Sequence, residues 1–212
     1  MNIRFTLVAE GSTDAALLPI LKWAVQSDPR VGQVEPSFAE PGMLPPTRIG
    51  LAERIRRALE LFPADLLFVH CDADREPTAT RRDEIGRAVE TAMVNQMTVP
   101  VVPVRMTEAW LLIDETAIRS AAGNPRGIVA LDLPRLGAIE GIADPKNVLY
   151  AALRTASESR GRRLRKFNTT AAAVLVAERI TDFTPLQRLS GFNEFEGLLR
   201  SALDNLAGSS KA

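Results

Sequence analysis

The sequence contains one cysteine and one histidine among its 212 residues. Cys71 alone cannot form a disulfide within the chain, and without a Cys-x-x-Cys pair the common cysteine zinc sites are excluded. His70 would have to serve any Ser-His-Asp hydrolase, and no serine follows a predicted strand to act as its nucleophile. Because it lies inside an apolar segment, we interpret His70 as a hydrogen-bonded core histidine. Carboxylates remain as the candidate catalytic groups.

Long apolar segments and an excess of one charge are also missing. No run of about 18 apolar residues predicts a membrane-spanning helix, and the N-terminal segment lacks the apolar core of a secretory signal. Together with the single cysteine, this indicates a cytoplasmic protein with no membrane partner. The 26 Lys and Arg residues balance the 26 Asp and Glu residues. Zero net charge excludes a protein that coats nucleic acid with its whole surface.

Several motifs for nucleotide binding and hydrolysis are absent. The sequence contains no G-x-x-x-x-G-K-[ST] phosphate loop, no G-x-G-x-x-G fingerprint, no H-E-x-x-H zinc motif and no G-x-S-x-G elbow. The chain therefore carries no recognisable ATPase of its own.

Apolar patterning predicts an α/β fold. The composition, 46% hydrophobic and 25% charged, is that of an ordinary globular protein. The unbroken apolar run at 66–71 is typical of a strand covered on both faces, whereas Pro100 and Pro103 indicate that the strand at 98–104 lies at a sheet edge or that the prolines lie at a strand end. Strands are predicted at 3–9, 34–39, 66–71 and 98–104, and helices at 15–25, 47–62, 80–95 and 107–122. We expect a Rossmann-like, mostly parallel sheet flanked by helices, with a helical C-terminal part.

The second half of the chain is predicted to be helical. After a Gly- and Pro-rich excursion at 123–143, Asp144 and Pro145 form an N-cap and first helical position, and further helices are expected at 171–180 and 185–206. The predicted organisation is a core at 1–143, a helical part at 144–207 packed on it, and a flexible tail at 208–212.

Local signals add three expectations. Ser12, Thr13 and Asp14 are candidate N-caps for the first helix. Pro19 predicts either a kink or a first turn that starts later. The arginines of the 47–62 helix are expected on its solvent face; they are Arg48, Arg54, Arg56 and Arg57.

Acidic residues follow two predicted strands. Glu10 comes after the first strand, and Asp72 and Asp74 come after the buried strand at 66–71. If the chain stays extended there, the spacing of two places Asp72 and Asp74 on one face, and Glu10 joins them if the two strands are neighbours. Such an oxygen-only site suits Mg²⁺ or Mn²⁺. The alternative is that Glu10 is an exposed strand-end acid and the aspartates are turn residues.

These residues resemble the TOPRIM fold of topoisomerases, primases and OLD-type nucleases. The resemblance is carried by Glu10-Gly11-Ser12-Thr13-Asp14 after the first strand and by Asp72-Ala73-Asp74 after a later one. It extends to the TOPRIM-like bacterial proteins grouped as domain of unknown function 4276, which have segments similar to Arg-Met-Thr-Glu-Ala-Trp-Leu-Leu at 105–112 and Asp-Pro-Lys at 144–146.

The resemblance implies metal-assisted phosphodiester chemistry. Asp72 and Asp74 would hold the cation, and Glu10 would share it or act as general acid and base. Glu108 is a candidate ligand of a second metal, or an acid in the first turn of a helix capped by Thr107. Lys146 is a candidate for neutralising the phosphate, or a solvent-facing helix residue.

A basic segment offers a second contact for nucleic acid. Its cations would engage phosphates and Phe167 would stack on a base, although a solvated loop between helices is the alternative. The candidate nucleic-acid-binding residues are Arg160, Arg162, Arg163, Arg165 and Lys166.

The preferred hypothesis is a Mg²⁺- or Mn²⁺-dependent TOPRIM-type nuclease acting on nucleic acid, DNA in the first instance, in phage defence or DNA repair. Because OLD-type nucleases join a TOPRIM domain to an ATPase, the resemblance also implies an ATPase partner encoded nearby. The alternatives are a non-catalytic regulatory or binding subunit of an ATPase complex, and a small-molecule phosphoesterase that uses the same acids.

Overall fold

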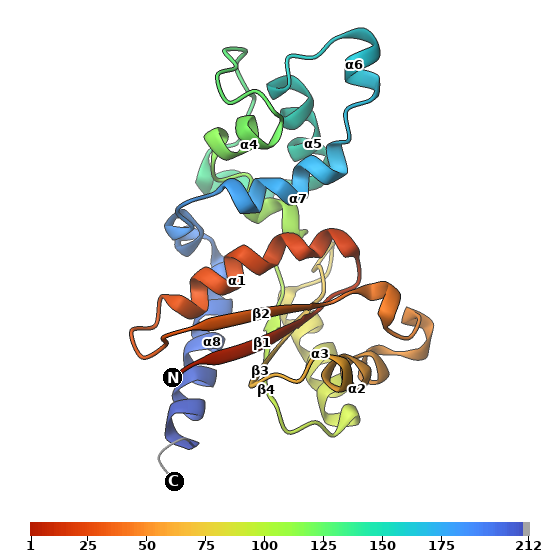
Figure 1. Cartoon of the computed structure of the whole chain (residues 1–212), viewed down its shortest axis with the longest axis vertical. Coiled ribbons are helices and arrows are strands. Elements are labelled where there is room, and N and C mark those ends of the chain that lie inside the picture. The colour runs from red at the N-terminus through yellow and green to blue at the C-terminus, as the bar shows by residue number, and fades with distance from the viewer. Residues whose placement is uncertain (210–212) are drawn as a thin grey trace.

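The computed structural model of the chain describes residues 1–209. A parallel sheet with its flanking helices forms the lower part of Figure 1, and a group of helices forms the upper part. The last long helix runs from the upper part back along the sheet. Within the described residues, no helix combines the length and the apolar character needed to cross a membrane.

Four parallel strands form the sheet in the order β2-β1-β3-β4. They are β1 (Ile3–Val8), β2 (Val34–Ala39), β3 (Leu66–His70) and β4 (Met97–Val101). The predicted mostly parallel sheet is confirmed, and so is the edge position of the proline-containing strand. Val8 pairs with Val69, so β1 and β3 end side by side. The strand order reverses between these two strands.

The two faces of the sheet are covered by different helices. Phe5, Leu7 and Phe68 face the core that includes α1 (Leu17–Gln26) and α8 (Ser190–Ser209). Val8, Leu67 and Val69 face the core that includes α2 (Leu51–Leu61) and α3 (Thr78–Ala92). This division follows from the alternation of side chains along each strand. β3 is buried along its whole length, as predicted for a strand covered on both faces.

The upper group contains four helices inserted between β4 and α8 (Figure 1). They are α4 (Glu115–Ala121), α5 (Pro145–Ala156), α6 (Gly161–Arg165) and α7 (Thr169–Arg179). An aromatic cluster joins this group to the sheet: the Trp110 ring lies 5.2 Å from that of Phe192, and Phe195 lies 6.0 Å from Phe68. α8 thus ties the upper helices to the sheet through apolar contacts.

Several boundaries differ from those predicted. The 107–122 helix is divided into a 3-10 helix (Thr107–Leu111) and α4, because the Asp114 side chain accepts the Ala117 N–H and starts a new helix. The 47–62 helix is interrupted by Gly50, whose φ of 106° only glycine adopts readily. Pro19 lies in the first turn of α1, so the later start is the correct alternative. The segment 185–206 likewise forms a 3-10 helix (Thr184–Arg188) followed by α8.

The predicted caps have mixed outcomes. Asp144 caps α5 by accepting the Asn147 N–H at 2.8 Å, as predicted. Neither Ser12 nor Thr13 caps a helix: the 3-10 helix Ser12–Ala16 begins after Gly11, and α1 has no side-chain cap. The boundary between 143 and 144 stays a prediction; α4 and α5, which lie on either side of it, are in contact. Residues 208 and 209 of the predicted tail belong to α8, and 210–212 lie outside the described residues.

Candidate functional site

The candidate site lies where β1 and β3 end. In open α/β sheets, ligands bind beyond the carboxyl ends of the strands at the point where the strand order reverses. Here that point is between β1 and β3. Glu10 to Asp14 follow β1, and Asp72 to Asp74 follow β3. Both acidic segments predicted from sequence are therefore brought to the edge where a ligand is expected.

Asp72 is held by groups from β3 and from the segment after β4. Its Oδ1 accepts the backbone N–H of Thr107 at 2.9 Å and lies 3.4 Å from His70 Nε2. The Thr107 hydroxyl is 3.1 Å from the same His70 nitrogen. Thr107 therefore does not cap the following 3-10 helix, which begins after Met106. Its main chain and side chain orient Asp72 instead.

His70 is buried, as expected of a core histidine, with 2% of its surface exposed. Its Nδ1 lies 2.9 Å from the Val101 carbonyl oxygen, which can only accept, so this nitrogen carries a proton. Burial lowers the pKa of His70, but the hydrogen bond and charge of Asp72, together with Asp14, outweigh burial and raise it. The other ring nitrogen, Nε2, faces the Thr107 hydroxyl and the two carboxylates.

Asp14 is a further candidate for the site that the sequence interpretation did not select. Its Oδ2 accepts the Gly11 N–H at 2.9 Å and lies 3.9 Å from His70 Nε2. Asp14 and Asp72 therefore approach the same nitrogen from the ends of neighbouring strands. Asp14 belongs to the acidic motif quoted above, but its position before a predicted helix favoured an N-cap over a site role.

Asp74 does not continue the strand. β3 ends at His70, and Asp74 has a φ of 54°, in the left-handed region. Its backbone N–H donates to the Arg105 carbonyl at 2.8 Å, and Arg105 Nη1 donates back to the Asp74 carbonyl at 3.0 Å. The condition that the chain stays extended from Asp72 to Asp74 is wrong, so their spacing does not place them on one face.

Glu10 is exposed at the end of β1. The residue before it is fixed by Arg54, whose Nη2 donates to the Ala9 carbonyl at 2.7 Å. Arg54 is only 4% exposed, so its predicted position on the solvent face of α2 is wrong. Burial, with a smaller contribution from the charge of Glu10, raises the pKa of the Cys71 thiol to about 12. Glu10 thus lies near Cys71.

Glu108 and Lys146 form an ion pair. Lys146 Nζ lies 3.2 Å from Glu108 Oε1; the lysine side chain is 40% exposed and the glutamate 9%. Burial raises the pKa of Glu108 against the opposing effect of Lys146. Partial burial lowers the pKa of Lys146, but Glu108 more than offsets this and raises it. The two candidates therefore meet each other, and Lys146 stays cationic.

A pocket of about 690 Å³ opens beside these groups. Its wall combines acidic residues with four cations and the start of α5. The cations are Arg75, Arg81, Arg105 and Lys146, and the other lining residues include Asp74, Asp144, Asn147 and Tyr150. Its four cations outnumber its three acids, Asp74, Glu76 and Asp144, by one. A small excess of positive charge at the carboxyl edge of a parallel sheet favours an anionic ligand.

No protein-family model, curated protein or solved structure matches this chain. The resemblance to TOPRIM proteins therefore stays a prediction from the motifs.

The candidate ligands are carboxylate oxygens, which suit a hard cation, but they do not surround a single point. Within residues 1–209, no group of three or more His, Cys, Asp or Glu residues is arranged to hold a metal ion. Mg²⁺ commonly binds to only one or two carboxylates and takes its other ligands from water and substrate phosphates. Asp72 and Asp14, at adjoining strand ends, fit that mode better than the predicted set of Glu10, Asp72 and Asp74.

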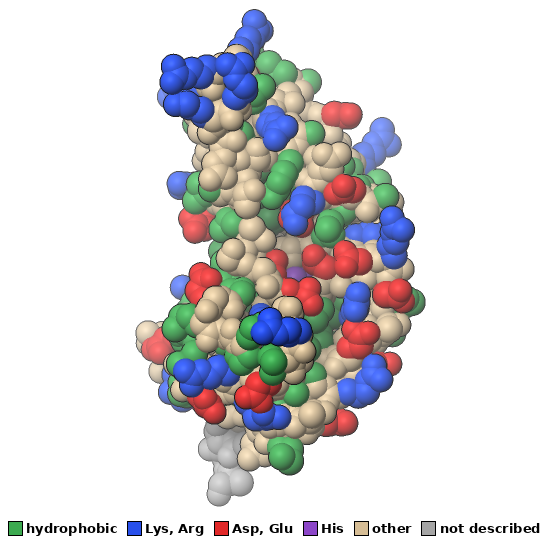
Figure 2. All heavy atoms as spheres, turned by 90° about the vertical axis from the view of Figure 1, so that its right-hand side faces the viewer, with side chains coloured by type: hydrophobic (Ala, Val, Ile, Leu, Met, Phe, Trp, Pro, Cys, Tyr) green, Lys and Arg blue, Asp and Glu red, His purple; other side chains and the backbone are tan. Residues whose placement is uncertain are grey.

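The predicted basic segment lies at the far end of the upper helices. Lys and Arg side chains gather at the upper end of the face in Figure 2, where Figure 1 places α6. In residues 1–209, none of the five cations at 160–166 forms an ion pair, and all five are exposed. Phe167 is partly buried and packs against the main core, and its role in stacking on a base stays a prediction.

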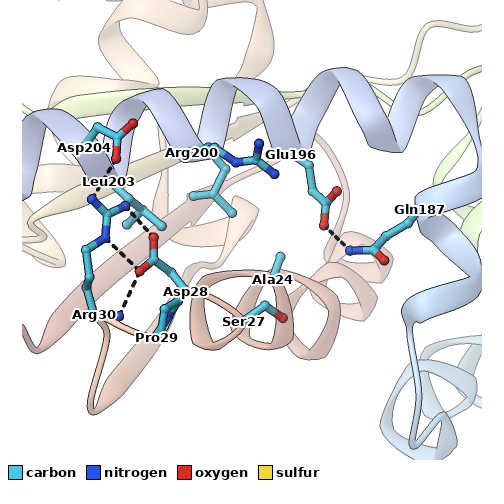
Figure 3. Close-up of a pocket in the computed structure, with 11 residues that line it drawn as sticks. Ala24, Ser27, Asp28, Pro29, Arg30, Gln187, Glu196, Arg200, Leu203 and Asp204 are labelled. Carbon is cyan, nitrogen blue, oxygen red and sulfur yellow. Dashed lines mark hydrogen bonds and ion pairs between the residues drawn. The ribbon is translucent and has the colours of Figure 1, made fainter.

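A second pocket, of about 400 Å³, lies between α1 and α8 (Figure 3). Asp28, Arg30 and Asp204 are joined there by ion pairs, and Gln187 hydrogen-bonds Glu196. This pocket is next to the segment that leads into β2, at the amino edge of the sheet. Its charged groups stabilise the contact of α1 with α8.

Proposed function

We propose that this protein is a Mg²⁺-dependent, TOPRIM-type enzyme that cleaves or transfers phosphodiester bonds of nucleic acid in the cytoplasm. One observation carries the proposal. Asp72, oriented by Thr107 and His70, lies where the strand order reverses, beside a pocket with four cations. An oriented carboxylate next to a basic pocket suits a substrate with a negatively charged reacting group.

The pocket supports a phosphate ligand. Lys146 is anchored by Glu108 and remains 40% exposed, so its ammonium group is available to a second anion. Arg105 is fixed by its bond to the Asp74 carbonyl. Anchored cations lose little conformational freedom on binding, which strengthens their contact with a phosphate.

Asp72 and Asp14 are the proposed ligands of Mg²⁺ or Mn²⁺, with Glu10 at the outer side. When bound, the cation would polarise the phosphoryl oxygen and stabilise developing negative charge. His70 Nε2 lies 3.4 Å from Asp72 and 3.9 Å from Asp14, so the buried ring contacts both aspartates. Glu108, which sequence interpretation assigned to a second metal, positions Lys146 in this proposal. Glu10 and Asp74, both exposed, are the candidates for proton transfer.

A second candidate function is a non-catalytic subunit that binds nucleic acid or an ATPase partner. It is favoured by the hydrogen bonds that Asp72 and Asp14 already accept from Thr107 and Gly11. Carboxylates that satisfy backbone N–H groups can serve to stabilise loops alone. In that case the pocket would bind the phosphate group without reaction.

Cleavage assays separate the two candidates. Purified protein is incubated with supercoiled plasmid, single-stranded DNA and RNA, with Mg²⁺, with Mn²⁺ or with EDTA. The enzyme proposal predicts metal-dependent cleavage that falls at least a hundredfold in Asp72→Asn and Asp14→Asn, while Asp132→Asn, at an exposed acid outside the site, keeps full activity. Wild-type protein that cleaves none of these substrates, or an Asp72→Asn variant as active as wild type, contradicts it. Co-purification of an ATPase without turnover would instead support the binding subunit.

A further inference from the structure

The loop at 124–130 displays an unusually exposed apolar side chain. Ile128 is 90% exposed and its neighbour Val129 is 46% exposed. Single exposed apolar residues are common on protein surfaces and need no explanation when their loop is mobile. The backbone around Ile128, however, is held firmly.

Hydrogen bonds from three other segments fix this loop. Glu158 Oε1 accepts the N–H groups of Ile128 at 2.6 Å and Val129 at 3.0 Å. Arg119 Nη2 donates to the Val129 carbonyl at 2.8 Å. Asn124 Nδ2 donates to the carbonyl of Ala156, the last residue of α5. The conformational entropy of the loop is thus already lost before any partner binds.

Gly127 allows this close packing. A Cβ atom at this position would lie 2.5 Å from Asn124 Nδ2 and 2.8 Å from Glu158 Oε1. Any side chain at 127 would therefore push away the groups that hold the loop. The absence of a side chain at Gly127 leaves room for Glu158 Oε1 to reach the N–H group of Ile128.

The same glutamate joins the loop to the basic helix. Glu158 lies two residues before Arg160, the N-cap of α6. The loop and α6 both lie at the upper end of the molecule in Figure 1. We call this region the distal tip; it comprises residues 124–130 and 158–166. It combines an apolar side chain on a fixed backbone with six exposed cations, five of them at 160–166 and the sixth Arg126.

α5 connects the distal tip to the candidate site. Lys146 in the first turn of α5 and Tyr150 in its middle line the pocket, and Ala156 at its end is bonded to the loop. From Lys146 to Ala156 the helix rises roughly 15 Å at about 1.5 Å per residue. At about 3.4 Å per nucleotide step, that distance corresponds to about five base pairs. A polynucleotide can reach both places, whereas a small phosphate ester cannot.

We propose that the distal tip is a second contact for a nucleic-acid substrate, with the α6 cations on phosphates and Ile128 inserted against the bases. This inference rests on the proposed function for the nature of the substrate. Apolar side chains are inserted between base steps by many proteins that bind the minor groove, and basic residues supply the affinity for the backbone. Five cations within seven residues, against one fully exposed apolar residue, favour a polyanion over a lipid surface.

Binding measurements test the tip without requiring turnover. The affinity of a fluorescein-labelled long duplex is measured by anisotropy over a series of salt concentrations, in EDTA. Ile128→Ser is expected to weaken binding about tenfold with an unchanged salt slope. Replacing Arg162 and Arg163 by Gln should lower the slope by about 0.9 for each cation removed. Met93→Ser, at an apolar residue 85% exposed after α3, is the matched control and should bind as wild type does.

For the variant Glu158→Ala, two explanations predict opposite changes in DNA-binding affinity. If charge alone controlled binding, removal of an acid beside the basic helix would strengthen it. The proposal predicts weaker binding, because the loop loses the acceptor that holds Ile128 in place. Circular dichroism and thermal unfolding confirm that each variant is folded. A Glu158→Ala variant that binds more tightly contradicts the role of the fixed loop.

The dependence on duplex length distinguishes DNA contacts at the tip from contacts at the pocket. The effect of Ile128→Ser should be smaller with DNA hairpins whose stems are shorter than about five base pairs, because such a stem cannot contact the pocket and the tip at once. The rate of cleavage of a chromogenic small phosphodiester should not change in Ile128→Ser. The cleavage assay therefore tests the proposed function, and the DNA-binding assay tests the tip proposal independently. The tip proposal is overturned if Ile128→Ser binds DNA as wild type does. It is also overturned if that variant loses only binding to anionic vesicles or only self-association.

Discussion

Lys146 Nζ lies 3.2 Å from Glu108 Oε1, and this pair joins two segments of the chain that sequence interpretation treated separately. Glu108 lies in the segment after β4, and Lys146 lies in the first turn of α5. Because the glutamate is almost buried, its charge needs the lysine as a partner.

Lys146→Met is therefore expected to destabilise the protein by about 1–3 kcal/mol at neutral pH. Loss of one partner of a fully buried pair costs about 3–5 kcal/mol, and the exposure of Lys146 reduces that cost. The double variant Glu108→Gln, Lys146→Met should recover most of the loss, whereas Lys22→Met, at an exposed lysine, should have little effect. Urea unfolding measures all three. Equal stability of Lys146→Met and wild type would show that the pair contributes nothing to the fold.

Thr107→Val is expected to cost about 1–2 kcal/mol, because the hydroxyl that contacts His70 and Asp72 is replaced by a methyl group of similar size. Thr107→Ser keeps the hydroxyl and should be closer to wild type. Thermal unfolding compares the two variants. Thr107→Val as stable as wild type would show that the hydroxyl contributes nothing, and loss of stability only in Thr107→Ser would assign the contribution to the threonine methyl group.

Acid should weaken the contact shown in Figure 3. The hydrogen bonds of Arg30 hold the pKa of Asp28 down, from its usual value near 4 to about 2. Since the folded state lowers this pKa, the stabilisation is complete above about pH 4 and is lost as the pH falls toward 2. Arg30 is 43% exposed, so solvent screening limits the contribution to about 1 kcal/mol.

The measurement for Asp28 is a comparison of unfolding at pH 5 and near pH 2.5. Asp28→Asn should be less stable than wild type at the higher pH, and the difference should shrink at the lower pH. Asp132→Asn provides the control for the general effect of removing a carboxylate. A difference that stays constant over this range would contradict the linkage to Asp28.

Cys71 should react slowly with thiol reagents in the folded protein. Burial leaves it 8% exposed and, with Glu10 nearby, raises the pKa of its thiol to about 12, so little thiolate is present at neutral pH. Reaction with an aromatic disulfide reagent is expected to be complete in urea and at least a hundredfold slower without it. Rapid reaction in native buffer would show that this end of β3 opens readily.

The sheet could be predicted because its strands are coded by local patterns. The apolar run before Asp72 predicted a strand covered on both faces, and Pro100 predicted an edge strand; β3 and β4 confirm both. Helix boundaries were less predictable. Asp114 starts α4 only because its side chain reaches the Ala117 N–H, a choice that periodicity does not reveal.

The sequence predicted that the acids after β1 and β3 would lie at adjoining strand ends, but not how each is held. The two acidic strand ends do adjoin, as expected if β1 and β3 are neighbours. The backbone of Asp74 has a left-handed conformation that turns the chain out of the strand. The expectation that Asp72 and Asp74 share one face, which required an extended chain, was therefore wrong. Arg54, interpreted as a solvent-facing arginine, is instead buried against the Ala9 carbonyl.

The sequence by itself determined the α/β class, the strands and the acids that follow β1 and β3, since each depends on residues close together in the chain. Only the tertiary structure decided that His70 lies near both Asp14 and Asp72. It also decided that Thr107 orients Asp72 and that Glu108 forms an ion pair with Lys146. These contacts depend on the order of the strands and on the path of the chain after β4. No local periodicity specifies either, because the packing of both faces of the sheet sets them together.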